Sequence, residues 1–240
     1  MKIILIFFYC LCLLETRVFS QIPAQDSAIT LKESKNIYIK NMGPQAPIYN
    51  GRQYLPYSFL MEGSPYFVSD SLSKGWIAYD KIIYDSMAMQ LDVSRDQLVI
   101  INLAGGTRIF LQNERIDSFH LLNHTFIRLA KNNASNIETT GFYDLLYRGS
   151  LQVYALRNKK FTESFTNGKI VRVFNNHDQF FILKNGRFSR VKKEDDVFGV
   201  LGGKRQEIKK LLRGQNLKFR RDGFEGALTM AVTLFDQLKN

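Results

Sequence analysis

The chain has 240 residues, a formal net charge of +11, 45% hydrophobic residues and 23% charged residues. This length suits one large domain or two small ones with a sizeable core. The composition is that of an ordinary globular protein, which excludes a collagen, a coiled coil and a largely disordered chain. The 19 phenylalanines and 11 tyrosines favour β-strands.

The first 20 residues have the parts of a secretory signal peptide. Lys2 precedes an apolar run over residues 3–14, and Val18 and Ser20 stand at the −3 and −1 positions of a cleavage site. The run is shorter than the roughly 20 apolar residues that a membrane-spanning helix needs. We therefore predict export and cleavage after Ser20; an uncleaved membrane anchor is the alternative.

Both cysteines, Cys10 and Cys12, lie inside this predicted signal peptide. The mature chain would therefore have no disulfide, thiolate metal site or cysteine nucleophile, and its core alone would have to stabilise it. Cleavage lowers the net charge by one, because it removes two basic residues and one acidic residue. A basic exported protein can bind nucleic acid, an anionic membrane or an acidic polymer.

Three segments follow in chain order. Residues 21–47 are polar and contain three prolines, which predicts an extended N-terminal segment. Residues 48–191 predict a β-rich domain, because short runs of β-branched and aromatic residues alternate with turn residues. Asn185-Gly186 is the strongest hairpin turn, since both residues tolerate positive φ. The predicted strands are 76–79, 87–93, 97–102, 107–111, 115–121, 125–129, 141–147, 150–157, 170–174, 179–183 and 187–191.

The period of the apolar residues changes after Val191, and residues 192–240 predict a helical segment packed on the β-rich domain. Helices are expected over 195–201 and 204–213 and from Asp222 onward. Gly214 is a candidate C′ residue, and Glu225 is the expected capping-box partner of Asp222. The fold class is therefore mainly β, with antiparallel hairpins in a sandwich or partly closed barrel, followed by two or three C-terminal α-helices.

Common catalytic and cofactor motifs are absent from the sequence, which contains no GxSxG, GxxxxGK[ST], GxGxxG or HExxH pattern. His120 and His124 are four residues apart, but they lie in a hairpin pattern, where this spacing does not make a metal site. The acidic run 194–196 is expected to cap the following helix and to favour its dipole. We therefore predict no catalytic residue, no metal and no cofactor.

The segment 201–221 carries eight basic residues and one acid. Its positive field predicts contact with an anionic surface, such as a membrane or an acidic glycan. A solvated helix face is the alternative. Nucleic acid is the least favoured ligand, because only Phe219 is available for base stacking. The candidate contact residues are Lys204, Arg205, Lys209, Lys210, Arg213, Lys218, Arg220 and Arg221.

Several short sequence patterns resemble a recurring layout. They are YNGRQY at 49–54, GSPYF at 63–67, GWIAYD at 75–80, DSFHL at 117–121, TFIRL at 125–129, GFYDLLY at 141–147 and KKLL at 209–212 with LKF at 217–219. In these the chain is similar to exported Bacteroidota-type proteins of unknown function. The resemblance implies a location in the bacterial envelope, in the periplasm or outside it, and a β-rich body. It implies no catalytic residues.

The sequence as a whole predicts an exported envelope protein, most simply a non-catalytic binding or scaffold module. One alternative is a secreted hydrolase whose acid and base are unmarked Asp, Glu or His residues. Another is a carrier whose β body encloses an apolar ligand. An enzyme needs converging titratable groups, whereas a carrier needs an apolar cavity of several hundred Å3.

Overall fold

The computed structural model describes residues 34, 37–38, 41–57, 61–166, 168–220 and 222–239. The predicted signal peptide and most of the segment 21–41 lie outside the described residues. Residues 42–240 form one compact unit, and the following description concerns that unit. Its first elements are two short 3-10 helices, η2 (Gly43–Gln45) and η3 (Pro47–Tyr49), and Ile48 is fully buried.

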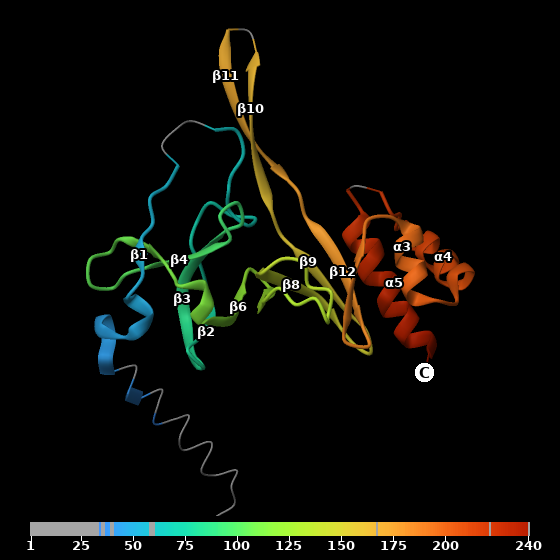
Figure 1. Ribbon diagram of the computed structural model, residues 1–240, viewed down its shortest axis with the longest axis horizontal. Coiled ribbons are helices and arrows are strands. Elements are labelled where there is room, and N and C mark those ends of the chain that lie inside the picture. The colour runs from blue at the N-terminus through green and yellow to red at the C-terminus, as the bar shows by residue number, and fades with distance from the viewer. Residues whose placement is uncertain are drawn as a thin grey trace, which may run out of the picture. The chain divides into compact units, whose positions relative to one another are not determined.

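One open sheet of eleven antiparallel strands makes up most of the unit (Figure 1). A two-residue strand, β1 (Arg52–Gln53), and β13 (Arg187–Val191) are its two edges. The order of the strands is β1-β5-β4-β3-β2-β6-β7-β8-β9-β12-β13. The remaining bounds are β2 (Ser73–Tyr79), β3 (Ile82–Asp92), β4 (Gln97–Ile101), β5 (Arg108–Phe110), β6 (Ile116–Leu121), β7 (His124–Leu129), β8 (Gly141–Arg148), β9 (Gln152–Leu156) and β12 (Gln179–Lys184), with a 3-10 turn, η4 (Asn113–Arg115), before β6.

The prediction of a mainly antiparallel β fold with C-terminal helices is confirmed. The sheet is not closed, because the described edge strands β1 and β13 do not pair with each other. Most predicted strands lie within one or two residues of their observed ends. Three parts of the sheet structure were missed, namely the two-residue strand β1, the first half of β3 and the whole of β10 (Lys159–Thr166). None of them has a long run of β-branched residues to mark it.

The predicted hairpin turn at Asn185-Gly186 joins β12 to β13. Asn185 has φ +51° and Gly186 has φ +76°, which is the left-handed backbone that a two-residue turn of this type requires. The register Lys184↔Arg187 closes the hairpin directly around these two residues. The sequence signal therefore specified both the position of the turn and its backbone conformation.

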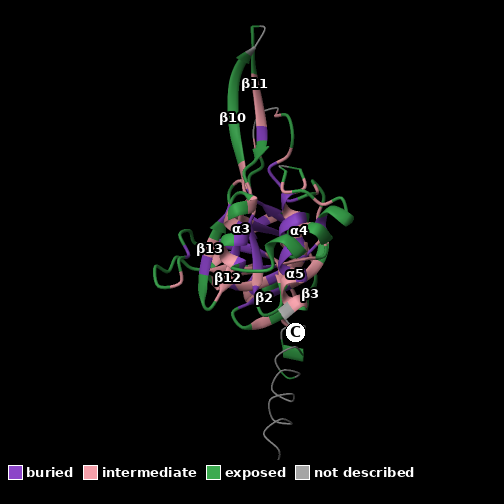
Figure 2. Ribbon diagram, turned by 90° about the vertical axis from the view of Figure 1, so that its right-hand side faces the viewer, coloured by how far each residue is buried: buried purple, intermediate pink, exposed green. Residues whose placement is uncertain are grey.

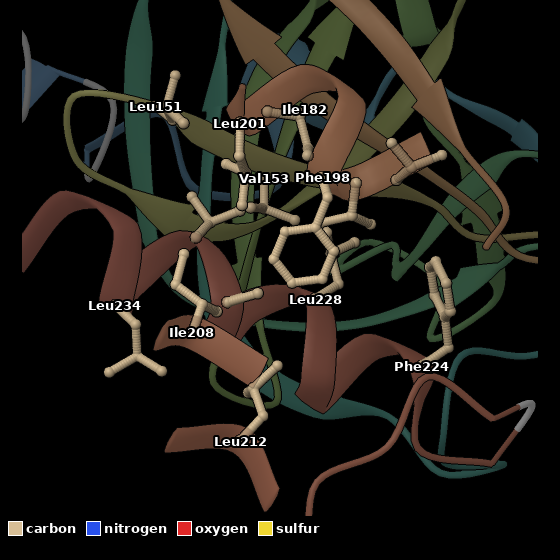
Figure 3. Packing of buried hydrophobic residues seen from close by; sticks show 14 residues of the cluster. Leu151, Val153, Ile182, Phe198, Leu201, Ile208, Leu212, Phe224, Leu228 and Leu234 are labelled. Atoms are coloured by element: carbon tan, nitrogen blue, oxygen red, sulfur yellow. The ribbon is translucent and has the colours of Figure 1, made fainter. Parts of the chain in front are cut away.

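Three helices follow the sheet: α3 (Glu194–Leu201), α4 (Arg205–Gly214) and α5 (Phe224–Lys239). Figure 2 shows them with buried inner sides and exposed outer sides. Their apolar side chains pack against one another and against residues of β9, β12 and β13 (Figure 3). Ile208, Leu228 and Val232 are fully buried in this cluster. Burial of such side chains from the C-terminal segment holds the helices on the sheet.

The helix ends differ from the predicted caps. Lys193 is the N-cap of α3, and the Asp196 carboxylate accepts hydrogen bonds from the backbone N–H groups of Lys192 and Lys193. Asp196 therefore stabilises the start of α3 from a position inside its first turn. Neither Asp196 nor Asp195 is the N-cap residue. Gly214 remains inside α4, and Asn216 supplies the positive φ. Glu225, the expected capping-box partner of Asp222, pairs with Arg157.

A two-stranded arm consists of β10, a turn and β11 (Lys169–Asn176), and we call residues 159–176 the arm. It continues the paired strands β9 and β12 beyond the sheet, because β9 precedes β10 and β12 follows β11 (Figure 1). Halfway along it Glu62 bridges to Val173, which is opposite Thr162, with hydrogen bonds to the backbone of Arg172 and Phe174. The upper part of the arm is mostly exposed (Figure 2).

The polar segment 131–140 is a loop, as predicted, with a single bridge between Asn132 and Ile137. Ile137 is buried against Tyr143, Phe181 and Phe188. The backbone carbonyl of Ser135 accepts a hydrogen bond from the N–H of Phe188, with an N–O distance of 2.8 Å. The loop therefore covers part of the outer edge of β13.

Candidate functional site

The predicted basic residues that the structure describes lie on α4 and in the loop between α4 and α5. On α4 some of them face α3 and others face solvent. Arg205, Lys209, Lys210 and Arg213 belong to α4, and Lys204 is its N-cap. Lys218 and Arg220 lie in the following loop. Arg221 lies outside the described residues. The basic segment thus covers one continuous stretch of chain, but its members have different surroundings.

Two of the predicted residues are ion-paired with the acidic run at the start of α3. Lys209 Nζ lies 2.5 Å from Glu194 Oε1, and Arg205 pairs with both Glu194 and Asp195. The hydrogen bond from Arg205 lowers the pKa of Asp195, and the same bond raises the pKa of Arg205. Glu194 and Asp195, which the sequence assigned to the dipole of α3, therefore also neutralise Arg205 and Lys209.

Five of the predicted residues form what we call the basic face, namely Lys204, Lys210, Arg213, Lys218 and Arg220. All five are exposed. Within the described part of the chain, no carboxylate lies in ion-pair contact with any of them. Together these five charges give a local positive field.

The apolar stripe of α4 points into the protein and takes no part in the basic face. Ile208 is fully buried and Leu212 is 3% exposed, and both pack in the cluster beneath the C-terminal helices. Leu211 is 40% exposed beside the basic residues. This arrangement places packing on one side of the helix and charge on the other. An open depression of about 670 Å3 separates the end of α3 from the start of α4.

A partly buried cluster of charges, which the sequence analysis missed, surrounds Arg157 between β9 and the arm. The Arg157 side chain donates from Nη2 to Asp144 Oδ2 at 2.6 Å, from Nη1 to Asp178 Oδ2 at 2.9 Å and from Nη1 to Glu225 Oε2 at 2.6 Å. Asp144 is fully buried on β8. One guanidinium therefore joins β8, the start of β12 and α5. We call these four residues and His124 the Arg157 cluster.

Burial by itself lowers the pKa of Arg157. The hydrogen bond with Glu225 and the charges of Asp144 and Glu225 outweigh that effect and raise its pKa above the usual value. The guanidinium is therefore permanently charged. Asp178 also accepts a hydrogen bond from the backbone N–H of Asn158, at 3.1 Å, which fixes the point where the arm leaves the sheet.

His124 contributes the imidazole ring of this cluster. Its Nδ1 lies 2.8 Å from Asp144 Oδ2, and its ring packs edge-on against Phe67 with a centroid distance of 4.9 Å. A carboxylate at Nδ1 orients an imidazole as in a general base. Asp144 Oδ2, however, also accepts two N–H groups of Arg157, while Asp144 Oδ1 is buried without a hydrogen-bond partner among the described residues.

The two histidines four residues apart lie on opposite faces of the β6–β7 hairpin. His120 is opposite Thr125, and His124 is opposite Leu121, so the side chains of His120 and His124 alternate across the sheet. His120 stacks on Trp76 and hydrogen bonds with Thr125. Their spacing does not bring the two rings together. Among the described residues, no three His, Cys, Asp or Glu side chains are arranged to hold a metal ion.

Comparisons with known proteins give no assignment: no family model, no curated protein and no solved structure matches the chain. The helices of the described residues include none that is both long and apolar enough to cross a membrane. Conclusions about function therefore depend on the basic face, the Arg157 cluster and the arm.

Proposed function

We propose that the protein is an exported, non-catalytic binding module of the cell envelope that attaches to anionic material through the basic face. One observation carries this proposal, namely five exposed basic side chains without a carboxylate partner in the described part of the chain. Near an anionic bilayer each Lys or Arg contributes on the order of 1 kcal/mol, and salt weakens that attraction. The buried apolar stripe of α4 supports adhesion at the surface in place of insertion of this helix.

The test is sedimentation of the exported protein with anionic vesicles and with an acidic polysaccharide at low and high salt. The face variant changes Lys204, Lys210, Arg213, Lys218 and Arg220 to Gln. The matched control changes five exposed basic residues elsewhere to Gln, namely Arg52, Lys74, Lys131, Arg148 and Arg187. Both variants lose the same formal charge, so any difference between them reports the location of the charge.

We expect the face variant to lose most of the binding and the control to lose much less of it. Wild-type binding should weaken steeply with salt, because the contacts are exposed. Equal losses in the two variants would show that net charge alone drives binding. Binding that does not change with salt concentration would contradict the proposal.

Export is part of the same proposal and has its own test. The intact mass of the exported protein should correspond to a chain that begins at Gln21 after cleavage behind Ser20. A mass that still includes residues 1–20 would contradict cleavage and favour a retained anchor.

A hydrolase is the second candidate, and the His124–Asp144 pair is the observation that favours it. Among the described residues, no hydroxyl or thiol hydrogen bonds to His124 to serve as a nucleophile. Hydrolysis of simple esters that is lost in His124→Gln, but not in His120→Gln, would support it. The carrier hypothesis needs a β body that encloses its ligand, and we do not propose it for an open sheet.

A further inference from the structure

Two large apolar side chains are exposed together near the tip of the arm. Phe165 is 75% exposed and Ile170 is 53% exposed. They are register partners on β10 and β11, so their side chains lie on the same face of the ribbon. Phe161, which is 39% exposed, lies on this face as well, since it is four residues from Phe165 on the same strand.

The charges of the arm are almost all positive. The segment contains Lys159, Lys160, Lys169 and Arg172, against the single acid Glu163. Arg172 Nε lies 2.7 Å from Glu163 Oε2, so this acid is neutralised by a cross-strand ion pair. An anionic surface would therefore meet basic groups and apolar groups on the arm, with no uncompensated carboxylate to repel it.

The length and the isolation of the arm separate its tip from the core. Four register pairs, from Glu163↔Arg172 to Thr166↔Lys169, lie beyond the bridge to Glu62, and at about 3.3 Å per residue they extend about 13 Å past it. A two-stranded ribbon is marginal by itself in water. This one is held at its base by Lys159, whose Nζ donates to the Tyr66 carbonyl at 2.6 Å, and halfway along by Glu62. Beyond Glu62 the tip has no such support among the described contacts.

We propose that the arm inserts Phe165 and Ile170 into the interface of an anionic lipid bilayer. This inference rests on the proposed function and names its partner, because a bilayer accepts apolar side chains and an acidic glycan does not. The long stem of Lys169 lets its charge remain at the headgroups. The outer backbone groups of the ribbon need hydrogen bonds, which limits insertion to the hydrated interface.

The first experiment measures binding of the exported protein to vesicles of phosphatidylglycerol and phosphatidylcholine, and to dextran sulfate. The arm variant is Phe165→Ser with Ile170→Ser. The matched control is Leu55→Ser with Leu103→Ser, which removes two apolar side chains of comparable exposure outside the arm. We expect the arm variant to lower vesicle affinity by about tenfold or more, with dextran sulfate affinity and the control unchanged.

The second experiment reports insertion directly. The chain has one tryptophan, Trp76, so Phe165→Trp in a Trp76→Phe background places a single fluorophore at the tip. Its emission should shift to shorter wavelength on addition of the vesicles, and lipids brominated near the headgroup should quench it. A control with Leu103→Trp in the same background should show neither effect.

The outcomes separate this inference from the proposed function. If the arm variant binds vesicles like wild type while the face variant does not, the arm inference is wrong and the proposed function stands. If wild type binds neither vesicles nor dextran sulfate, the proposed function fails, and an unshifted emission from Trp at position 165 then also overturns the arm inference. Self-association that the arm variant abolishes, with vesicle binding unchanged, would assign the tip to a second copy of the chain.

Discussion

Arg157 and Asp144 form an ion pair in which the carboxylate is fully buried and the Arg side chain is 9% exposed. Asp144 lies in the middle of β8, and Arg157 follows the end of β9, its neighbour in the sheet. The same guanidinium reaches Glu225 on α5. Arg157 therefore ties β8 to the last helix, and its loss should destabilise both.

Arg157→Met should lower the free energy of unfolding by about 3 kcal/mol or more, because it leaves Asp144 buried without its cation. Arg157→Lys should recover only part of this loss, since an ammonium cannot reproduce the forked hydrogen bonds. Denaturant unfolding measures both. Lys81→Gln, which removes an exposed ion pair with Asp117, is the control and should cost less than about 1 kcal/mol. Equal effects would contradict the role of the cluster.

Gly75 permits the close approach of β2 and β6. A Cβ added there would lie 1.8 Å from the backbone carbonyl oxygen of His120. Gly75→Ala should therefore force β2 and β6 apart at this point and destabilise the protein by about 2 kcal/mol or more. Gly199→Ala is the matched control, because the exposed site in α3 has free space and alanine favours helices. A thermal melt in which both variants resemble wild type would refute the close approach.

Gly186 is a different case, because space is available and only the backbone is restrictive. No atom lies within 4 Å of a Cβ added there, but φ is +76°. Gly186→Val should lower the free energy of unfolding by about 1 kcal/mol or more, since a β-branched residue fits positive φ badly. An unchanged melting temperature would tell against a tight turn at Asn185-Gly186.

The raised pKa of Asp92 predicts that the stability of the protein depends on pH. Burial raises its pKa, although Tyr54 and the N–H groups of Arg95 and Ser94 hydrogen bond to it and act in the opposite direction. A folded-state pKa above the unfolded value of about 3.9 means that the folded state binds the proton more tightly. This contribution to stability is therefore largest at low pH and falls as pH rises through the raised pKa.

Asp92→Asn should remove that contribution. The difference in free energy of unfolding between wild type and Asp92→Asn should decrease as pH rises from about 4 to about 7. Urea unfolding at several pH values measures it. A difference that is constant with pH would contradict a raised pKa at Asp92.

Local sequence patterns predicted the features of the fold that depend on neighbouring residues. The turn at Asn185-Gly186, the change from strands to helices after Val191 and the buried stripe of α4 are all of this kind. Strand β10 was missed because Lys159-Lys160 and Glu163 interrupt its apolar residues and it has no buried face of its own. Its structure depends on pairing with β11.

The two candidate sites also differ in how far sequence patterns could predict them. The basic segment is contiguous in sequence, so its charge was visible, but the pairing of Arg205 and Lys209 with the start of α3 was not. Arg157 meets partners 13, 21 and 68 residues away, and only the strand order brings them together. A usable signal was present in Asp144, a carboxylate within an otherwise apolar strand, GFYDLLY, where an unpaired charge would be costly.

The contact between Ser135 and Phe188 bears on how copies of this chain avoid polymerising. An open sheet ends in strands whose outer backbone groups can recruit a strand from another molecule. At β13 one of these donors is already occupied by the carbonyl of Ser135, and Ile137 anchors the same loop in the apolar cluster beneath it. An incoming strand would first have to displace the loop and expose Ile137 to water. The loop thus obstructs the addition of a further strand at this part of β13.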